Sequence, residues 1–151
     1  NFNVNDPSNL NDKFLRVKVR KLISNLEDDG LSLDKFKLSL KNLDKSNFAI
    51  DHYVQKNICD NSRYLKLTKS IILKDDFFNQ PDEIVFRSFS EAIQKVGKRN
   101  TFARGAKVEN LLKNLIFSNN YSKKTLSGCV IQKFQNSVII SPEKWKNTSK
   151  L

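Results

Sequence analysis

Basic side chains are the residues of this sequence whose types and spacing point most clearly to chemistry. Arg16 and Arg20 stand four positions apart in a stretch with helical periodicity, so they share one flank of a helix with Lys13, while Lys18 lies on the other flank. A guanidinium group can bind two phosphate oxygens at once. We therefore predict that Arg16, Lys18 and Arg20 face a phosphate. The alternative is a solvated helix face with a few ion pairs.

A second basic cluster spans the end of one expected helix, a loop and the start of the next. No acidic residue interrupts the sequence from Ala92 to Val108. Such a charge density is typical of an edge that binds the phosphates of a nucleic acid, although simple solvation is an equal alternative. The residues that we predict to bind phosphates here are Lys95, Lys98, Arg99, Arg104 and Lys107.

The composition agrees with a polyanionic partner. The 151 residues include 27 Lys and Arg against 16 Asp and Glu, which gives a net charge of +11. Such an excess favours RNA, DNA or an anionic membrane surface as partner. No apolar run is long enough to cross a bilayer and no secretory signal is visible, so we expect a cytoplasmic protein without membrane association. Because the chain begins at Asn1 without Met, we expect a fragment or a processed piece.

Catalytic and metal-binding motifs are missing from the sequence. With four glycines, the chain has no Gly-rich phosphate loop and no nucleophile elbow. Cys59 and Cys129 form no disulfide framework, and with the single His52 they match no zinc site. We therefore expect no catalytic residue, no metal and no cofactor within this chain. Phe77 and Phe78 are expected in the core rather than on a base-stacking platform.

Hydrophobic periodicity predicts a mainly α protein of the α+β class. Leu15, Val19, Leu22 and Leu26 define one helical face, and a longer stripe from Leu33 to Val54 defines a second helix. Gly30 suits the end of the first helix and Ser32 the start of the second. We expect an antiparallel helical hairpin over about residues 12–58, with a coiled-coil dimer through 33–54 as the alternative. Oligomeric state stays open.

The rest of the chain is expected to add two helices and a small β element. The helices span about 82–97 and 105–119, and residues 69–78 are ambiguous but read as helical. Alternating or β-branched stretches predict a two- to three-stranded element at 63–67, 125–131 and 137–140. We expect residues 1–141 to form one helical domain and residues 142–151 to form a polar tail or linker.

Four short stretches, in order, resemble one protein family. Residues 6–9 (D-P-S-N) and 14–20 (F-L-R-x-K-x-R) resemble the segment just after the catalytic domain of tRNA(Ile)-lysidine synthases. Residues 83–96 resemble the family's helix with an arginine, here Arg87. Residues 102–108 resemble its next helix opening, and 124–131 resemble its T-L-G-G-C strand. The sequence departs from the family at Lys18, where Arg is frequent, at Val17, where Asn is frequent, and in lacking a proline at 100–102.

The resemblance implies a function for a longer parent protein. The family uses ATP, with Mg²⁺, to adenylate the wobble cytidine of an isoleucine tRNA with a CAU anticodon, and then joins lysine to that carbon. The family's catalytic S-G-G-x-D-S loop is absent here, so the resemblance implies the substrate-binding part of this ATP-dependent ligase, inactive alone. Residues 1–141 would then be the tRNA-binding domain that follows the catalytic domain, and Arg16, Lys18 and Arg20 would face its active site. The resemblance implies that ATP and lysine bind to the catalytic domain and not to this chain. The alternative function is a freestanding basic helical protein that binds nucleic acid.

Overall fold

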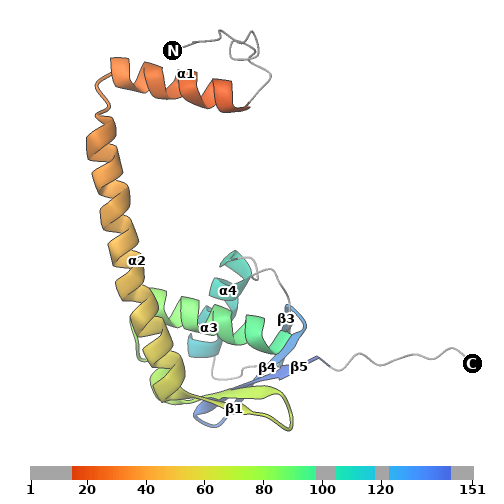
Figure 1. Ribbon diagram of the computed structural model, residues 1–151. Helices are drawn as coiled ribbons and strands as arrows, with labels where there is room; N and C mark the ends of the chain where they lie inside the picture. Colours follow the sequence, from red (N-terminus) through yellow and green to blue (C-terminus); the bar gives the residue numbers. More distant parts are fainter. Residues whose placement is uncertain (1–14, 98–104, 118–122, 144–151) are drawn as a thin grey trace, which may run out of the picture. The chain divides into compact units, whose positions relative to one another are not determined.

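The computed structural model describes residues 15–97, 105–117 and 123–143, and the chain divides into two compact units, residues 1–47 and 48–151. Within the described ranges lie four α-helices, one short 3-10 helix and a five-stranded sheet (Figure 1). The helices are α1 (Leu15–Asp28), α2 (Leu33–Asn61), α3 (Asp82–Gly97) and α4 (Gly105–Phe117). The division between the units falls inside α2. The prediction of a mainly α, α+β protein is confirmed.

Local capping sets the boundary between α1 and α2. Gly30 has a φ of +97°, a left-handed conformation that glycine adopts without strain, and its N–H donates to the carbonyl of Glu27 (3.0 Å). The N–H of Leu31 donates to the carbonyl of Leu26, which closes the end of α1 (2.7 Å). At the start of α2, the hydroxyl of Ser32 accepts a hydrogen bond from the N–H of Lys35 (3.4 Å). The predicted roles of Gly30 and Ser32 are confirmed.

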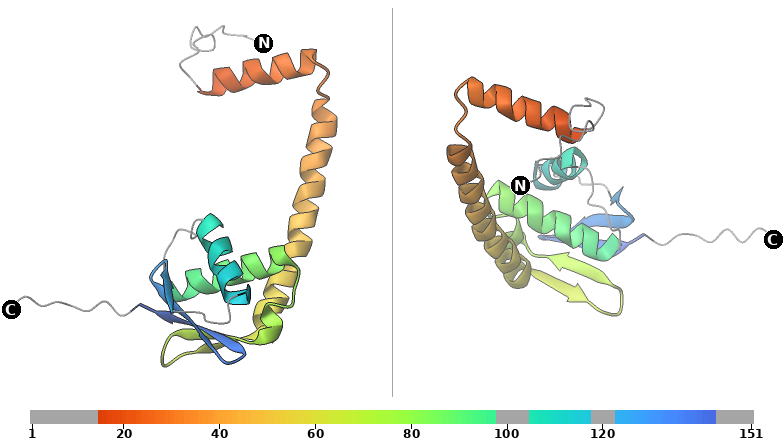
Figure 2. Two further views of the ribbon diagram at one scale, coloured as in Figure 1. Left: turned by 180° about the vertical axis from the view of Figure 1, so that it is seen from behind. Right: turned by 45° about the horizontal axis from the view of Figure 1, so that its top comes forward.

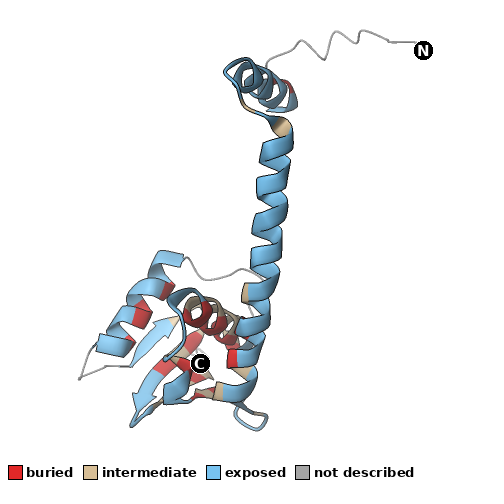
Figure 3. Ribbon diagram, turned by 90° about the vertical axis from the view of Figure 1, so that its left-hand side faces the viewer, coloured by how far each residue is buried: buried red, intermediate tan, exposed pale blue. Residues whose placement is uncertain are grey.

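The apolar stripes of these two helices are largely exposed. Val17 is buried, but Leu15, Leu22 and Leu43 expose 76%, 60% and 61% of their surface. Figure 3 shows the same exposure along the first part of α2. The two helices and their short connection follow the expected order, yet within the described residues they do not bury their stripes against each other. The coiled-coil alternative stays a hypothesis that sedimentation can test.

The sheet lies in the second unit and is antiparallel throughout. Its strands are β1 (Ser62–Leu65), β2 (Ser70–Leu73), β3 (Lys124–Leu126), β4 (Cys129–Phe134) and β5 (Ser137–Pro142), in the order β1-β2-β5-β4-β3. β5 pairs with β2 through Ile140 and Ile71, so strands that are far apart in the sequence meet at the centre. The sheet thus pairs β2, from the first part of this unit, with β5, from its last part.

The structure corrects the sequence prediction at three points in the β region. The sheet has five strands rather than two or three. Residues 69–78 are not one helix, because they form β2 and the 3-10 helix η2 (Asp75–Phe77). The expected strand 125–131 is divided into β3 and β4 by a tight turn at Ser127 and Gly128, which both have positive φ. Two such residues are typical of a two-residue hairpin turn that matches strand twist.

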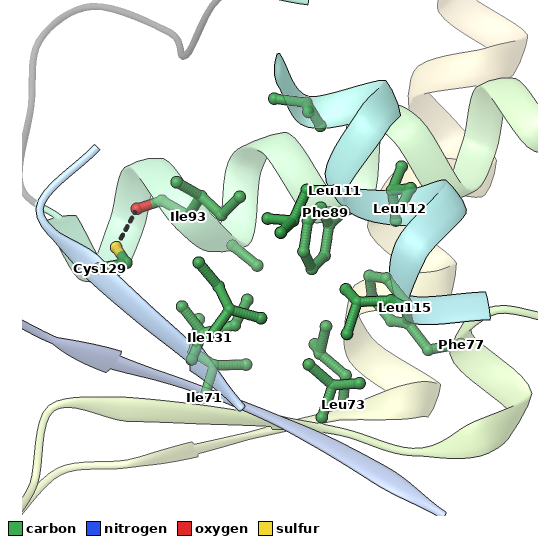
Figure 4. Close-up of a cluster of buried hydrophobic side chains, with 14 of the residues drawn as sticks. Ile71, Leu73, Phe77, Phe89, Ile93, Leu111, Leu112, Leu115, Cys129 and Ile131 are labelled. Carbon is green, nitrogen blue, oxygen red and sulfur yellow. Dashed lines mark hydrogen bonds between the residues drawn. The ribbon is translucent and has the colours of Figure 1, made fainter. Parts of the chain in front are cut away.

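The core of the second unit lies between the sheet and helices α3 and α4. Both helices lie on the same side of the sheet (Figures 1 and 2). Every second residue of β2 and β4 points toward them, so Ile71, Leu73 and Ile131 are buried against Phe89 and Leu115 (Figure 4). Phe77 is fully buried and lies edge-on to the half-buried Phe78, with ring centroids 5.3 Å apart. The core assignment of Phe77 is confirmed.

A buried polar contact fixes the end of α2 to this core. The amide nitrogen Nδ2 of Asn57 donates to the carbonyl of Phe77 (3.2 Å) and to the hydroxyl of Ser88 (3.3 Å). The amide of Asn61 in turn donates to Oδ1 of Asn57 (2.9 Å). Because buried polar groups are costly unless they are hydrogen-bonded, this network specifies where the last turns of α2 lie against α3.

Candidate nucleic-acid interface

The first predicted set of cations lies on α1. This helix is continuous from Leu15 to Asp28, so Arg16 and Arg20 are neighbours on one flank, one helical turn apart. Arg16, Lys18 and Arg20 are all exposed. Lys18 and Arg20 have no ion pair or hydrogen bond from their side chains within residues 15–97, 105–117 and 123–143. The helix therefore presents cations to its surroundings, as expected, while the partner of these cations stays a prediction.

The structure describes only the two ends of the second predicted cluster. Lys95 lies in the last turn of α3 and Lys107 in the first turn of α4, and both are exposed. Lys98, Arg99 and Arg104 lie outside the described residues. A cation at a helix C-terminus is favoured by the helix dipole, whereas one at an N-terminus is not. Lys107 is thus not placed where helix stability alone would favour it.

Lys95 connects this cluster to the edge of the sheet. Its ammonium nitrogen Nζ lies 5.2 Å from the centroid of the Tyr64 ring on β1, which is a cation–π contact. The hairpin formed by β1 and β2 contributes further exposed cations, namely Arg63, Lys66 and Lys69. Sequence reasoning missed these three residues as candidates. Their spacing of three residues is visible in the sequence, but only the strand pairing shows that they lie on the same hairpin as Tyr64, the ring that Lys95 contacts.

Arg87, the arginine of the family-like helix, joins α3 to α2. Its Nε donates to Oε1 of Glu83 at 2.6 Å, and its Nη1 donates to Oδ1 of Asp51 at 3.2 Å. The hydrogen bond to Glu83 is the main cause that raises the pKa of Arg87 above its ordinary value, and Asp51 adds to it. This arginine keeps its charge at any physiological pH. Through these contacts Arg87 links α3 to α2, so its guanidinium group serves a structural contact rather than a phosphate.

Groups that could support catalysis are sparse in the described part of the chain. It contains no cluster of three or more His, Cys, Asp or Glu side chains that could hold a metal ion. His52 is exposed, and its ring meets the edge of Tyr53 with centroids 5.6 Å apart. Cys129 is buried, and its Sγ donates to the carbonyl of Ile93 at 3.2 Å, while Cys59 is exposed. No described helix is long and apolar enough to cross a membrane.

These observations define a class of protein: a small basic α+β module whose exposed cations lie on a helix and along the edge of a sheet. Comparison with known proteins narrows this class. The chain is 22% identical to a tRNA(Ile)-lysidine synthase from Anaplasma marginale (strain St. Maries) over 130 residues, 86% of the chain and 28% of that protein. It is 24% identical to a tRNA(Ile)-lysidine synthase from Wolbachia sp. subsp. Brugia malayi (strain TRS) over 143 residues, 95% of the chain and 33% of that protein.

The similarity is therefore distant and partial. The chain spans about a third of the length of the curated relatives that it matches. No family model matches the chain, and no solved structure does either. The described parts of the family-like stretches fall on defined elements: the start of α1, almost all of α3, the start of α4, and the β3–β4 hairpin. Residues 6–9, 14 and 102–104 of these stretches lie outside the described residues.

Proposed function

We propose that this chain is the tRNA-binding part of a tRNA(Ile)-lysidine synthase. The observation that carries the proposal is the similarity to two such synthases, which covers 86% and 95% of the chain but only 28% and 33% of the relatives. A match over most of this chain but only about a third of each relative is expected for one part of a longer enzyme. The net charge of +11 and the exposed cations of α1 and of the β1–β2 hairpin supply the attraction that an RNA partner requires.

On this proposal the parent enzyme's catalytic domain carries out the reaction, and this chain binds the tRNA. In the family, ATP activates the wobble cytidine and lysine then attacks the activated carbon. This chain contains no Gly-rich phosphate loop that could hold ATP. We infer that its role is to hold the tRNA, with the cluster of Lys95, Lys98, Arg99, Arg104 and Lys107 bound to phosphates. A parent reading frame with an S-G-G-x-D-S loop upstream separates this function from that of a freestanding nucleic-acid-binding protein.

Binding of tRNA as a function of salt tests the proposal. Neutralising the cluster residues to Gln one at a time should weaken tRNA binding and lower the slope of log K against log salt by roughly one for each phosphate that is no longer bound. Filter binding at four salt concentrations measures this slope. Matched controls are Lys41→Gln on α2 and Lys113→Gln on α4, which remove an exposed lysine outside the cluster. An unchanged slope in all five cluster variants would show that these residues do not bind phosphates.

A further inference from the structure

A hollow beside Lys95 has the lining of a site for a nucleic-acid base. It measures about 390 Å³, at the lower end of the volumes found for small-ligand sites. The last turns of α2, the edge strand β1, its neighbour β2 and the second half of α3 surround it, all in the second unit. The residues that carry its chemistry are Gln55, Tyr64, Ile71, Glu91, Gln94 and Lys95.

An aromatic ring forms one wall of this hollow. Tyr64 pairs with Ile71 across β1 and β2, so its side chain stands on the sheet face that α3 covers. Ile71 is 3% exposed and closes the hollow toward the core, whereas Tyr64 is 43% exposed and open to solvent. A half-exposed tyrosine over an apolar base of this kind offers a ring on which a nucleobase can stack.

A carboxylate and two amides also line the hollow. The amide Nε2 of Gln55 on α2 donates to Oε2 of Glu91 on α3 at 2.9 Å, which holds the carboxylate in place. A carboxylate has about four acceptor positions, so Glu91 keeps capacity for two further donors. Gln94 adds a second amide next to it on α3. The hollow therefore pairs a stacking surface with an acceptor-rich, oriented edge.

We infer that this hollow binds a guanine base from a single-stranded part of an RNA. Guanine places two adjacent donors, N1–H and the N2 amino group, on its Watson–Crick edge, and one carboxylate can accept both. Adenine and cytosine each offer one amino group next to a ring nitrogen that is itself an acceptor, which Glu91 repels. Uracil offers one N–H between two carbonyl oxygens. Guanine is thus the base whose donors match the site.

Lys95 has a different task in the bound state. In the structure its ammonium nitrogen lies over the Tyr64 ring, 5.2 Å from the ring centroid. Stacking of a base on an aromatic side chain is stronger than an exposed cation–π contact, so the base displaces Lys95 from the ring. The freed ammonium group can then meet the phosphate of the same nucleotide. Lys95 therefore strengthens binding through its charge, whereas Tyr64 and Glu91 determine which base is bound.

Short labelled RNAs test this assignment, which rests on the proposed function. Fluorescence anisotropy of the full chain with the pentamers UUGUU, UUAUU, UUCUU and UUUUU should show a preference of about tenfold for the guanine-containing RNA. Tyr64→Ala should weaken binding of UUGUU about tenfold, and Tyr64→Phe should restore it, since the ring suffices for stacking. Glu91→Gln should remove the preference for guanine while binding of UUAUU stays unchanged.

Matched controls keep the outcomes distinct. Tyr53→Ala on α2 and Glu109→Gln on α4 remove an exposed tyrosine and an exposed glutamate outside the hollow, and neither should change the preference. Equal affinity for all four pentamers overturns the base site, but the proposed function stands if tRNA still binds with a steep salt slope. Absence of any RNA binding overturns both. Competition by free GMP at the concentration at which UUGUU competes assigns the hollow to a free nucleotide and overturns its RNA role.

Discussion

Gly97, the last residue of α3, has no room for a side chain. A Cβ atom at this position would lie 2.3 Å from the carbonyl oxygen of Ser127 and 3.1 Å from Sγ of Cys129. The carbonyl belongs to the tight turn between β3 and β4, so it cannot move away as a flexible side chain would. A close approach of backbone to backbone explains why glycine stands here.

Gly97→Ala should therefore destabilise the protein. Alanine gains about 1 kcal/mol of helix propensity over glycine inside a helix, but the clash with Ser127 costs about 1–3 kcal/mol as overpacking does elsewhere, so the net change should be a decrease in stability. Urea denaturation followed by circular dichroism measures it. Gly105→Ala is the matched control, because its Cβ would meet only the Phe86 ring at 3.7 Å, an ordinary contact. A Gly97→Ala protein as stable as Gly105→Ala contradicts the expected clash.

Residues whose role depends on near neighbours are predictable from the sequence. Gly30 and Ser32 act through hydrogen bonds to residues at most five positions away, and the sequence predicts both roles. It also predicts Gly97 as a helix end, but the close approach of Gly97 to Ser127 arises from the β3–β4 hairpin, whose turn lies 30 residues further along the chain. The sequence pattern likewise places Tyr64 only in a strand, because its neighbours Lys95 and Glu91 come from α3.

Arg87 shows how much an exposed ion pair contributes to the contact between two elements. It bridges Glu83 on its own helix and Asp51 on α2, and its side chain is 33% exposed. Because solvent screens such pairs, Arg87→Met should lower stability by only about 0.5–1 kcal/mol, and by less in high salt. Urea denaturation at low and high salt measures both effects. Lys56→Met, which breaks the exposed pair with Asp60 inside α2, is the control and should leave stability within experimental error.

The pH dependence of this link follows from the direction of the shift. The pKa of Arg87 is raised in the folded state, so its stabilising contribution is complete below the ordinary arginine pKa and disappears only as pH rises through the raised value. The difference in stability between wild type and Arg87→Met should thus stay constant from about pH 6 to 9. A decline within that range contradicts the assignment of the contribution to the charge of Arg87.

At the level of elements, long amphipathic helices are predictable and the inner strand β2 is not. The three- and four-residue spacing of α3 and its terminal Gly97 predict that helix, and its bounds at 82–97 are confirmed. β2 contains three consecutive apolar residues, Ile71, Ile72 and Leu73, and so short a run has no period that separates strand from helix. Pairing with β1 on one side and β5 on the other makes this run a strand. Ile140, the β5 partner of Ile71, lies nearly 70 residues further along the chain.

At the scale of the whole molecule, the two basic sets are predictable from charge alone, but the surroundings of Lys95 are not. A stretch with several cations and no acidic residue is visible in the sequence, whereas the hollow beside Lys95 requires α2, β1 and α3 to be brought together. Arg16 and Arg20 belong to the other unit, and by resemblance they follow directly after a catalytic domain. We propose that they point toward its active site, where they steady a phosphate of ATP or of the acceptor nucleotide.

This division of roles predicts different kinetics for the two sets in the full-length enzyme. Arg16→Ala or Arg20→Ala should lower turnover roughly a hundredfold and change tRNA affinity little, because an arginine in a catalytic cleft stabilises charge that develops in the transition state. Arg20→Lys should recover only part of the rate, since lysine keeps the charge but lacks the bidentate fork. Single-turnover rates with saturating tRNA, compared with tRNA affinity from filter binding, separate the two effects, with Lys41→Ala as the control. If variants of both sets weaken affinity equally and leave turnover of bound tRNA intact, Arg16 and Arg20 bind tRNA like the other cluster and do not act on the reacting phosphate.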